Sequence, residues 1–186
     1  MNILDLYQVK QSVYTSQELS QLFPDDSPQK LNSALHYAVK TGKLKRLRRG
    51  IYVKNDYSVV ELANCIYIPS YVSLETVLRA SGIIFQTDTS IQSVSYLSRE
   101  VMVDQTKLIY RKLKYQVLTN PLGLVVNGRE AVATPERALL DSLIVFKNYH
   151  FDNLSGVNWD LVEALLPIYQ SKTLITKVSK LRKRIK

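Results

Sequence analysis

The sequence predicts an α+β protein, in which a mainly helical N-terminal part precedes a small mixed α/β part with a mostly antiparallel sheet and C-terminal helices. Apolar residues recur every three or four positions in 3–22 and 28–40, which is the period of an amphipathic helix. Segment 91–133 instead contains short apolar runs and Asn127-Gly128, a tight-turn signal between strands. Helical spacing then returns for the rest of the chain.

Length and composition place the chain among globular proteins. Its 186 residues are 46% hydrophobic and 22% charged, enough for one or two domains with a real core. Asn55-Asp56 reads as a short linker, so we predict one domain over 1–55 and another over 56–186.

The first two predicted helices are short. Helix 3–11 carries Ile3, Leu6 and Val9 at helical spacing. Thr15 or Ser16 can cap the next helix, over 17–22, and Glu18 suits the positive end of its dipole. We expect its inward side chains to be Leu19, Leu22 and Phe23.

The stretch 27–54 has the strongest pattern in the chain. Ser27 can cap a helix and Pro28 can occupy its first position, where a missing N–H costs nothing. Gly42 suits the left-handed residue that ends many helices. The predicted apolar face consists of Leu31, Ala34, Leu35, Ala38 and Val39.

A short cationic hairpin follows this helix, with its turn near 48–50. Segment 27–55 contains eight Lys or Arg residues and no Asp or Glu. A polar helix followed by a basic hairpin is typical of a winged helix-turn-helix, whose helix fits the major groove of DNA while the hairpin contacts the backbone or minor groove. The alternative to a DNA-binding role is a solvated basic hairpin beside an ordinary surface helix. The predicted DNA-binding residues are Gln29, Lys30, Asn32, Ser33, His36, Lys40, Lys43, Lys45, Arg46, Arg48 and Arg49.

The net charge of +9 is concentrated at the two ends of the chain. Residues 1–55 carry nine basic and four acidic side chains, and 172–186 carry seven basic and none acidic. The remaining 56–171 carry nine basic and twelve acidic side chains, a net −3. Segregated positive charge favours a polyanionic partner, although charge alone does not separate DNA from RNA.

The second part mixes helices and strands. We predict a helix that Ser58 caps and that runs through Cys65, and a second from Leu74 to Ser81, with Ser73 as its cap and Gly82 as its stop. Predicted strands cover 91–97, 108–113, 115–118, 124–126 and 130–133. Further helices are expected over 134–146, 158–169 and 173–184. The last of these helices has a narrow apolar seam and basic outer faces. It could serve as a docking helix or as a second phosphate-binding surface, and the alternative is an ordinary solvated helix. Its seam is Leu174, Val178, Leu181 and Ile185.

Three segments in this order resemble AbiEi-type antitoxins and related predicted transcriptional regulators of bacteria. The first is the N-terminal module that ends in Arg48-Arg49-Gly50-Ile51-Tyr52. The second, 69–78, is PSYVSLETVL, closed by Gly82-Ile83-Ile84. The third, 133–141, is ATPERALLD. The resemblance spans roughly residues 5 to 145.

This resemblance implies a winged helix followed by an α/β antitoxin domain. It also implies a repressor that binds inverted repeats in its own promoter. The implied partner is a nucleotidyltransferase-like toxin, opposed functionally rather than through a stable complex.

The residue inventory argues against an enzyme. One cysteine and two histidines, Cys65, His36 and His150, form no recognisable zinc site. The sequence has no Asp-X-Asp pair for catalytic magnesium and no complete phosphate-binding loop. Cys65 is more simply a buried thiol, Glu136 a helix-dipole partner and Asp141 a buried, paired carboxylate. We therefore expect no catalytic activity, no cofactor and no metal.

We expect a cytoplasmic protein, because the chain has no signal-peptide pattern and no run long enough to span a membrane. The leading hypothesis is a DNA-binding repressor, with its oligomeric state open. The alternative is a protein- or RNA-binding interaction module without sequence-specific DNA binding.

Overall fold

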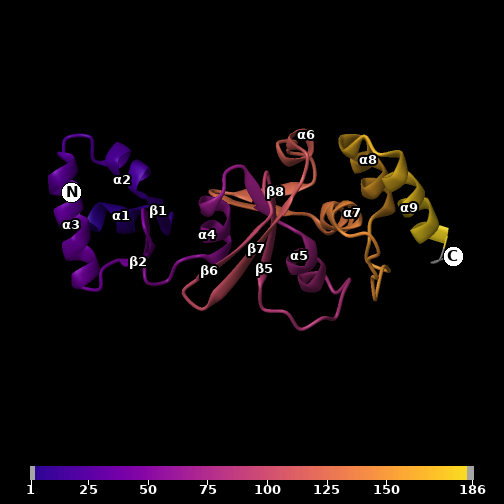
Figure 1. Cartoon of the computed structure of the whole chain (residues 1–186), viewed down its shortest axis with the longest axis horizontal. Coiled ribbons are helices and arrows are strands. Elements are labelled where there is room, and N and C mark those ends of the chain that lie inside the picture. The colour runs from indigo at the N-terminus through magenta and orange to yellow at the C-terminus, as the bar shows by residue number, and fades with distance from the viewer. Residues whose placement is uncertain (1–2, 184–186) are drawn as a thin grey trace.

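The computed structural model describes residues 3–183 and shows an elongated α+β molecule with its termini at opposite ends (Figure 1). Residues 3–53 form three helices and a small sheet, in the order helix, strand, helix, helix, strand, strand. These elements are α1 (Ile3–Gln8), β1 (Val13–Thr15), α2 (Ser16–Leu22), α3 (Pro28–Lys40), β2 (Lys45–Arg48) and β3 (Ile51–Val53).

The first sheet has the order β1-β3-β2, and both pairings are antiparallel. Successive side chains of a strand point to opposite faces, and the two faces of this sheet belong to two different cores. Tyr14 and Tyr52 face the three helices, whose buried side chains include Leu19, Leu31 and Leu35. The opposite face belongs to the larger core of the chain and consists of Val13, Ile51 and Val53. The sheet therefore lies between α1–α3 and the rest of the molecule.

The second part contains a six-stranded sheet with the order β6-β7-β5-β4-β9-β8. Three of its pairings are antiparallel, and β4–β9 and β5–β7 are parallel. Its strands are β4 (Ser70–Val72), β5 (Ile91–Ser95), β6 (Arg99–Val103), β7 (Thr106–Lys112), β8 (Leu124–Asn127) and β9 (Glu130–Ala133). The accompanying helices are α4 (Val59–Ile66), α5 (Leu74–Ala80), α6 (Tyr115–Leu118), α7 (Pro135–Val145), α8 (Trp159–Tyr169) and α9 (Lys172–Lys183).

Helices cover both faces of this sheet. Tyr110 of β7 donates a hydrogen bond to the Ala63 carbonyl of α4 at 2.7 Å. Tyr71 of β4 donates to Asp141 of α7 at 3.0 Å, from the opposite face. The layers therefore follow one another along the long axis as α3, first sheet, α4, second sheet, α5 with α7, and finally α8 with α9 (Figure 1).

Several sequence predictions are confirmed. Thr15, Ser27, Ser58 and Thr134 cap helices through side-chain hydrogen bonds, and Gly42 has a φ of +70° just after α3. Among the predicted apolar residues of α3, three are buried and two are half-buried, as the helical period requires. The seam of α9 is buried at Leu174 and Val178, whereas Ile185 lies outside the described residues.

Other predictions are wrong. Residues 115–118 form the helical turn α6 rather than a strand, because the apolar pair Val117 and Leu118 packs inward from one turn of helix. Leu22 is 49% exposed instead of inward, since the chain leaves α2 directly after it. Helix α1 ends at Gln8, so Val9 is exposed and lies outside it.

Two further corrections concern local bonding. Ser73 occupies the cap position of α5 but makes no cap bond, because its hydroxyl donates to Asp141 at 2.7 Å. The β8–β9 turn is centred on Gly128 and Arg129, with Asn127 still in the strand. Sequence reading also missed β1 and β6, which are short or carry charges.

Candidate nucleic-acid interface

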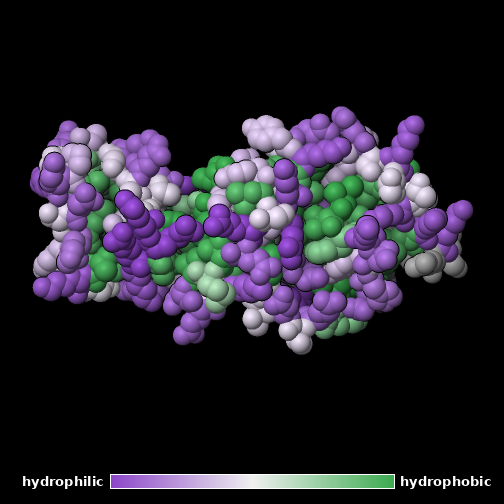
Figure 2. Space-filling view, viewed as in Figure 1, coloured by the Kyte–Doolittle hydropathy of each residue, from purple (hydrophilic) through white to green (hydrophobic). Residues whose placement is uncertain are grey.

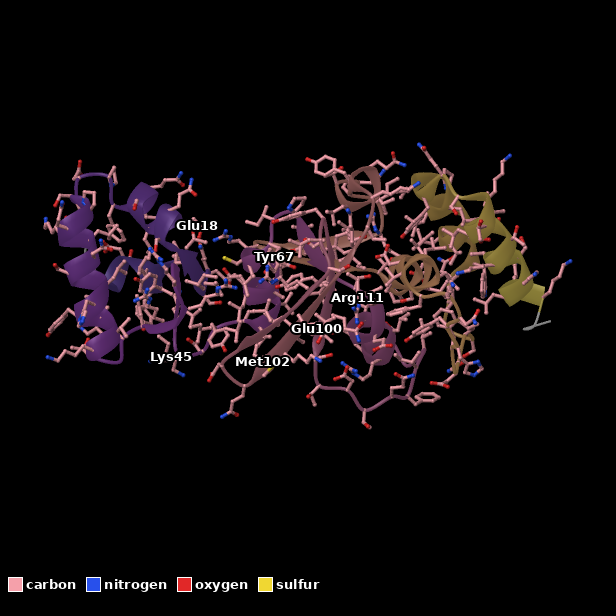
Figure 3. The ribbon with its side chains drawn as sticks, viewed as in Figure 1. Glu18, Lys45, Tyr67, Glu100, Met102 and Arg111 are labelled. Atoms are coloured by element: carbon pink, nitrogen blue, oxygen red, sulfur yellow. The ribbon has the colours of Figure 1, made fainter. Side chains whose placement is uncertain are left out.

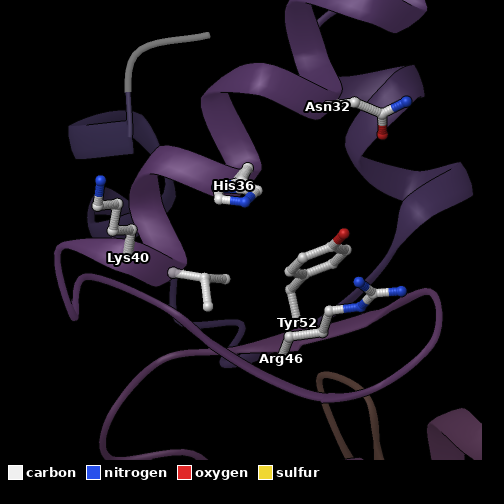
Figure 4. Close-up of a pocket in the computed structure, with 6 residues that line it drawn as sticks. Asn32, His36, Lys40, Arg46 and Tyr52 are labelled. Atoms are coloured by element: carbon white, nitrogen blue, oxygen red, sulfur yellow. The ribbon is translucent and has the colours of Figure 1, made fainter.

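Helix α3 and the β2–β3 hairpin enclose a shallow groove of about 460 Å³. Four side chains of α3 line one wall, and two from the hairpin line the other (Figure 4). The polar lining residues are Asn32, His36, Lys40, Arg46 and Tyr52. Helix α3 and the hairpin that follows it thus form one surface with amide, imidazole and cationic groups.

Local sequence explains why α3 presents this face. The Ser27 hydroxyl accepts a hydrogen bond from the Lys30 amide at 3.3 Å and fixes where the helix begins. Leu31, Leu35 and Ala38 are buried, at spacings of four and three residues. Residues offset from them by one position, including Asn32 and His36, therefore point away from the core. Helix packing, rather than the polar residues themselves, sets the orientation of the exposed face.

The hairpin register divides its cations between two faces. Arg46 pairs with Tyr52, so both side chains lie on the side of the sheet that carries α3. Lys45 pairs with Val53, which belongs to the opposite side, and Arg48 is opposite Ile51 after an irregularity in the register. Of the strand cations, Arg46 is the one that lines the groove with α3.

The predicted DNA-binding residues are all exposed, but the structure brings only some of them together. Asn32, His36, Lys40 and Arg46 share the groove. Lys30 is not part of the groove and forms an ion pair with Asp26 at 2.7 Å. The remaining positions lie on the outer surface of α3 and on the hairpin: Gln29, Ser33, Lys43, Lys45, Arg48 and Arg49.

Tyr52 is a lining residue that the sequence analysis missed. It is 8% exposed, and its ring points from β3 toward α3 (Figure 4). Side chains alternate between the two faces of β3, so Tyr52 must face away from its neighbours Ile51 and Val53. This alternation in the sequence could have identified Tyr52 as a residue on the α3 side. Its phenol contributes both an apolar floor and a hydroxyl to the groove.

Polar bonds attach this module to the rest of the chain on the side away from α3. Arg129 forms an ion pair with Glu18 of α2, which is labelled in Figure 3, and donates to the Val13 carbonyl at 3.4 Å. Glu61 of α4 accepts hydrogen bonds from the Ser12 amide at 2.9 Å and the Ser12 hydroxyl at 2.5 Å. These contacts hold the first sheet against α4 and leave the groove uncovered.

The remaining buried charges have structural partners. Arg137 is fully buried and donates to the carbonyls of Val117 at 2.6 Å and Asn120 at 2.8 Å. Asp141 accepts from three hydroxyls, including that of Tyr169 at 2.7 Å. A paired and enclosed carboxylate of this kind fixes packing rather than contacting a ligand. The prediction that Asp141 is a buried carboxylate with hydrogen-bond partners is thus confirmed.

Two other candidate groups also have ordinary environments. Burial raises the pKa of the Cys65 thiol to about 11, so the reactive thiolate is scarce at neutral pH. Glu136 is buried and accepts the Asn158 amide at 3.1 Å, a role that joins α7 to the start of α8. Within residues 3–183, the structure contains no cluster of three or more metal-ligating side chains.

Comparisons with known protein families and with curated proteins returned no match for this chain. In the part of the chain that the structure describes, no helix combines the length and apolar character needed to cross a bilayer.

Proposed function

We propose that this protein binds double-stranded DNA with sequence preference, as a winged helix-turn-helix in which α3 enters the major groove. The observation that carries the proposal is the groove shared by α3 and the hairpin, where Asn32, His36 and Lys40 face Arg46. An α-helix fits the major groove, and Asn or Gln can form a bidentate pair with adenine. The hairpin cations would neutralise neighbouring phosphates.

The position of α3 supports this proposal. It forms the outermost layer at one end of the molecule, and the second sheet lies behind the first sheet (Figure 1). Hydrophilic side chains dominate this end, whereas larger hydrophobic areas appear over the middle (Figure 2). A duplex could therefore approach α3 without moving the rest of the chain.

We further propose that DNA binding serves repression, with the chain acting as the antitoxin of a toxin–antitoxin pair in the cytoplasm. The support is the resemblance of three segments to AbiEi-type antitoxins, including Arg48-Arg49-Gly50-Ile51-Tyr52. A nucleotidyltransferase reading frame beside this gene, and loss of promoter activity when the protein is expressed, are the observations that would support this role.

Selection of bound fragments from random duplex DNA is the first experiment. We expect a recurrent motif, and fluorescence anisotropy should then show tighter binding to that motif than to scrambled duplex. Duplex RNA and single-stranded competitors should displace the motif poorly. Equal binding to all four nucleic acids would contradict sequence-specific DNA recognition and favour the RNA-binding or interaction-module alternative.

Arg46→Ala tests the hairpin side of the groove. Because a phosphate contact carries no base preference, binding should weaken on every duplex, and the slope of log affinity against log salt should fall by about one unit. Lys180→Ala, an exposed cation on α9 at the other end of the molecule, is the matched control. An unchanged slope in Arg46→Ala would remove the hairpin from the interface.

Asn32→Ala tests the helix side. Loss of a base contact should cost about 1–3 kcal/mol on the selected motif while changing affinity for scrambled duplex little. Repeating the selection with this variant should relax the motif at one or two positions. A variant that keeps the wild-type motif would show that Asn32 does not read bases.

A further inference from the structure

Strand β8 is an outer strand of the second sheet and has β9 as its one strand partner among the described residues. The other outer strands of the two sheets are protected. Strands β2 and β6 carry charged side chains, which discourage edge-to-edge pairing. In β1, the Val13 carbonyl already accepts bonds from Gln11 at 2.8 Å and Arg129 at 3.4 Å. The sequence of β8, Leu-Val-Val-Asn, contains no charge and no proline.

The hairpin geometry of β8 leaves backbone groups pointing outward. Asn127 and Glu130 flank a two-residue turn, so they form a hydrogen-bonded pair, and such pairs alternate along an antiparallel ladder. Val126 pairs with Ala131 in the intervening position, and its N–H and C=O therefore point away from β9. These are the groups that a further strand would bond.

The side chains around this edge are apolar and exposed. Val125 is 60% exposed, Val126 is 64% exposed and Leu122 is 57% exposed. Residues 115–128 contain no charged side chain, and a charge from outside the segment reaches β8 at its last residue, where Lys10 donates to the Asn127 side-chain oxygen at 3.2 Å. Val125 and Val126 point to opposite faces of the strand, so apolar side chains flank the edge on both faces around Val126. Exposed apolar side chains without charge are typical of the centre of a protein–protein interface.

We propose that β8 pairs with β8 of a second copy of this chain, in antiparallel orientation about a two-fold axis through Val126. In such a pairing, the outward N–H and C=O of Val126 meet the same groups of the copy and form two reciprocal hydrogen bonds. Strand β8 itself contributes no charged side chain to such a pairing, whereas a charged partner strand would have to bury its own charge against Val125 and Val126.

The charge distribution favours this arrangement over other self-contacts. Strand β8 lies in the middle of the long axis, and the net positive segments 1–55 and 172–186 contain the elements at the two ends (Figure 1). A two-fold axis at β8 brings together the central parts, where 56–171 is mildly acidic, and leaves the basic ends away from the axis. Contacts between the ends would instead oppose like charges.

Sedimentation velocity over about 1–100 µM protein, without nucleic acid, tests this inference separately from the proposed function. The wild type should shift from monomer toward dimer as concentration rises. Val126→Lys and Val126→Pro should each raise the dimer dissociation constant about tenfold or more, since a charge or a missing N–H disrupts edge pairing. Met102→Lys, at an equally exposed apolar position on β6, should dimerise like the wild type (Figure 3).

Hydrogen exchange of the wild type supplies a readout that needs no variant. The Val126 amide should exchange more slowly at the high concentration than at the low one, while those of 99–103 should not change. A wild type that stays monomeric at the highest concentration would overturn the proposal. Equal dissociation by Met102→Lys, or unchanged exchange in β8, would also overturn it.

Discussion

Glu18 and Arg129 show how single residues couple two parts of the chain. Burial acts to raise the pKa of Glu18, but hydrogen bonds from Arg129 and the Thr15 backbone outweigh it and hold this pKa below its ordinary value of 4.5. A depressed acidic pKa stabilises the folded state above the unfolded-state pKa, and this contribution is lost as pH falls through the folded-state value. The ion pair should therefore stabilise the folded state at neutral pH, and this stabilisation should be lost in acid when Glu18 becomes protonated.

We predict that the free energy of unfolding of the wild type falls as pH drops below about 4.5, and that Glu18→Gln shows a flatter pH dependence. Urea unfolding at several pH values measures this difference. Glu163→Gln, whose ion pair with Arg182 is exposed, is the control and should follow the wild type. A Glu18→Gln curve parallel to the wild type would contradict the coupling.

Residue-scale features were predicted from sequence where the local chain decides them. Helix caps at Ser27 and Ser58 depend on bonds to an amide three residues later, so they could be predicted. Partners far apart in sequence could not: Arg129 and Glu18 are 111 residues apart. Ser73 looks like a cap in sequence, but Asp141, 68 residues later, takes its hydroxyl.

At the scale of elements, the connection between α6 and β8 is unusually close to its neighbours. Gly123 has a φ of +72°, and a Cβ placed there would lie 3.1 Å from Leu165 and 3.2 Å from Arg137. Both the left-handed backbone and the approach to α7 and α8 therefore require glycine. Thr134 at the start of α7 also donates its amide to the Gly123 carbonyl at 2.8 Å.

We predict that Gly123→Ala lowers the free energy of unfolding by about 2–4 kcal/mol, because backbone strain and a steric clash add together. Gly42→Ala shares the positive φ but has open space around its Cβ position, so about 1 kcal/mol is expected. Chemical denaturation of both variants separates the cost of backbone strain, which they share, from the cost of the steric clash at Gly123. Equal losses would show that crowding at Gly123 is relieved by small movements.

The pattern of elements was largely predictable, and its failures have a common cause. Long periodic stretches such as 28–40 and 135–145 identify their helices directly. Short segments do not: 115–118 is apolar enough for a strand, and its packing against α8 far along the chain accompanies a helical turn instead. The charged strand β6 has no apolar run to reveal it and is defined by its pairing with β7.

At the scale of the whole molecule, the two basic regions lie at opposite ends (Figure 1). The basic helix α9 packs through Leu174 and Val178 and keeps Lys180 and Lys183 exposed. A duplex bound at α3 would therefore not reach α9 unless it were long or strongly bent. Because of this separation, the length of the duplex can test whether α9 is a second phosphate-binding surface.

We predict that Lys180→Gln combined with Lys183→Gln leaves affinity for a duplex of about 12 base pairs, roughly 40 Å long, within about twofold of the wild type. Anisotropy titrations on this duplex and on one several times longer make the comparison at two salt concentrations. Weaker binding confined to the long duplex at low salt would mark α9 as a second phosphate-binding surface. A loss on the short duplex as large as that of Arg46→Ala would contradict the separation.

The sequence by itself determined the α+β class, the extent of α3, the cationic hairpin and the concentration of charge at the chain ends. Each of these depends on neighbouring residues, through helical period, capping, turn chemistry and composition. The tertiary structure alone decided that Arg46 shares a groove with Asn32 and His36 while Lys45 faces the other side of the sheet. It also decided that, among the described residues, β8 pairs with β9 alone. Strand register and sheet order follow from contacts between distant segments, whose packing no local pattern specifies.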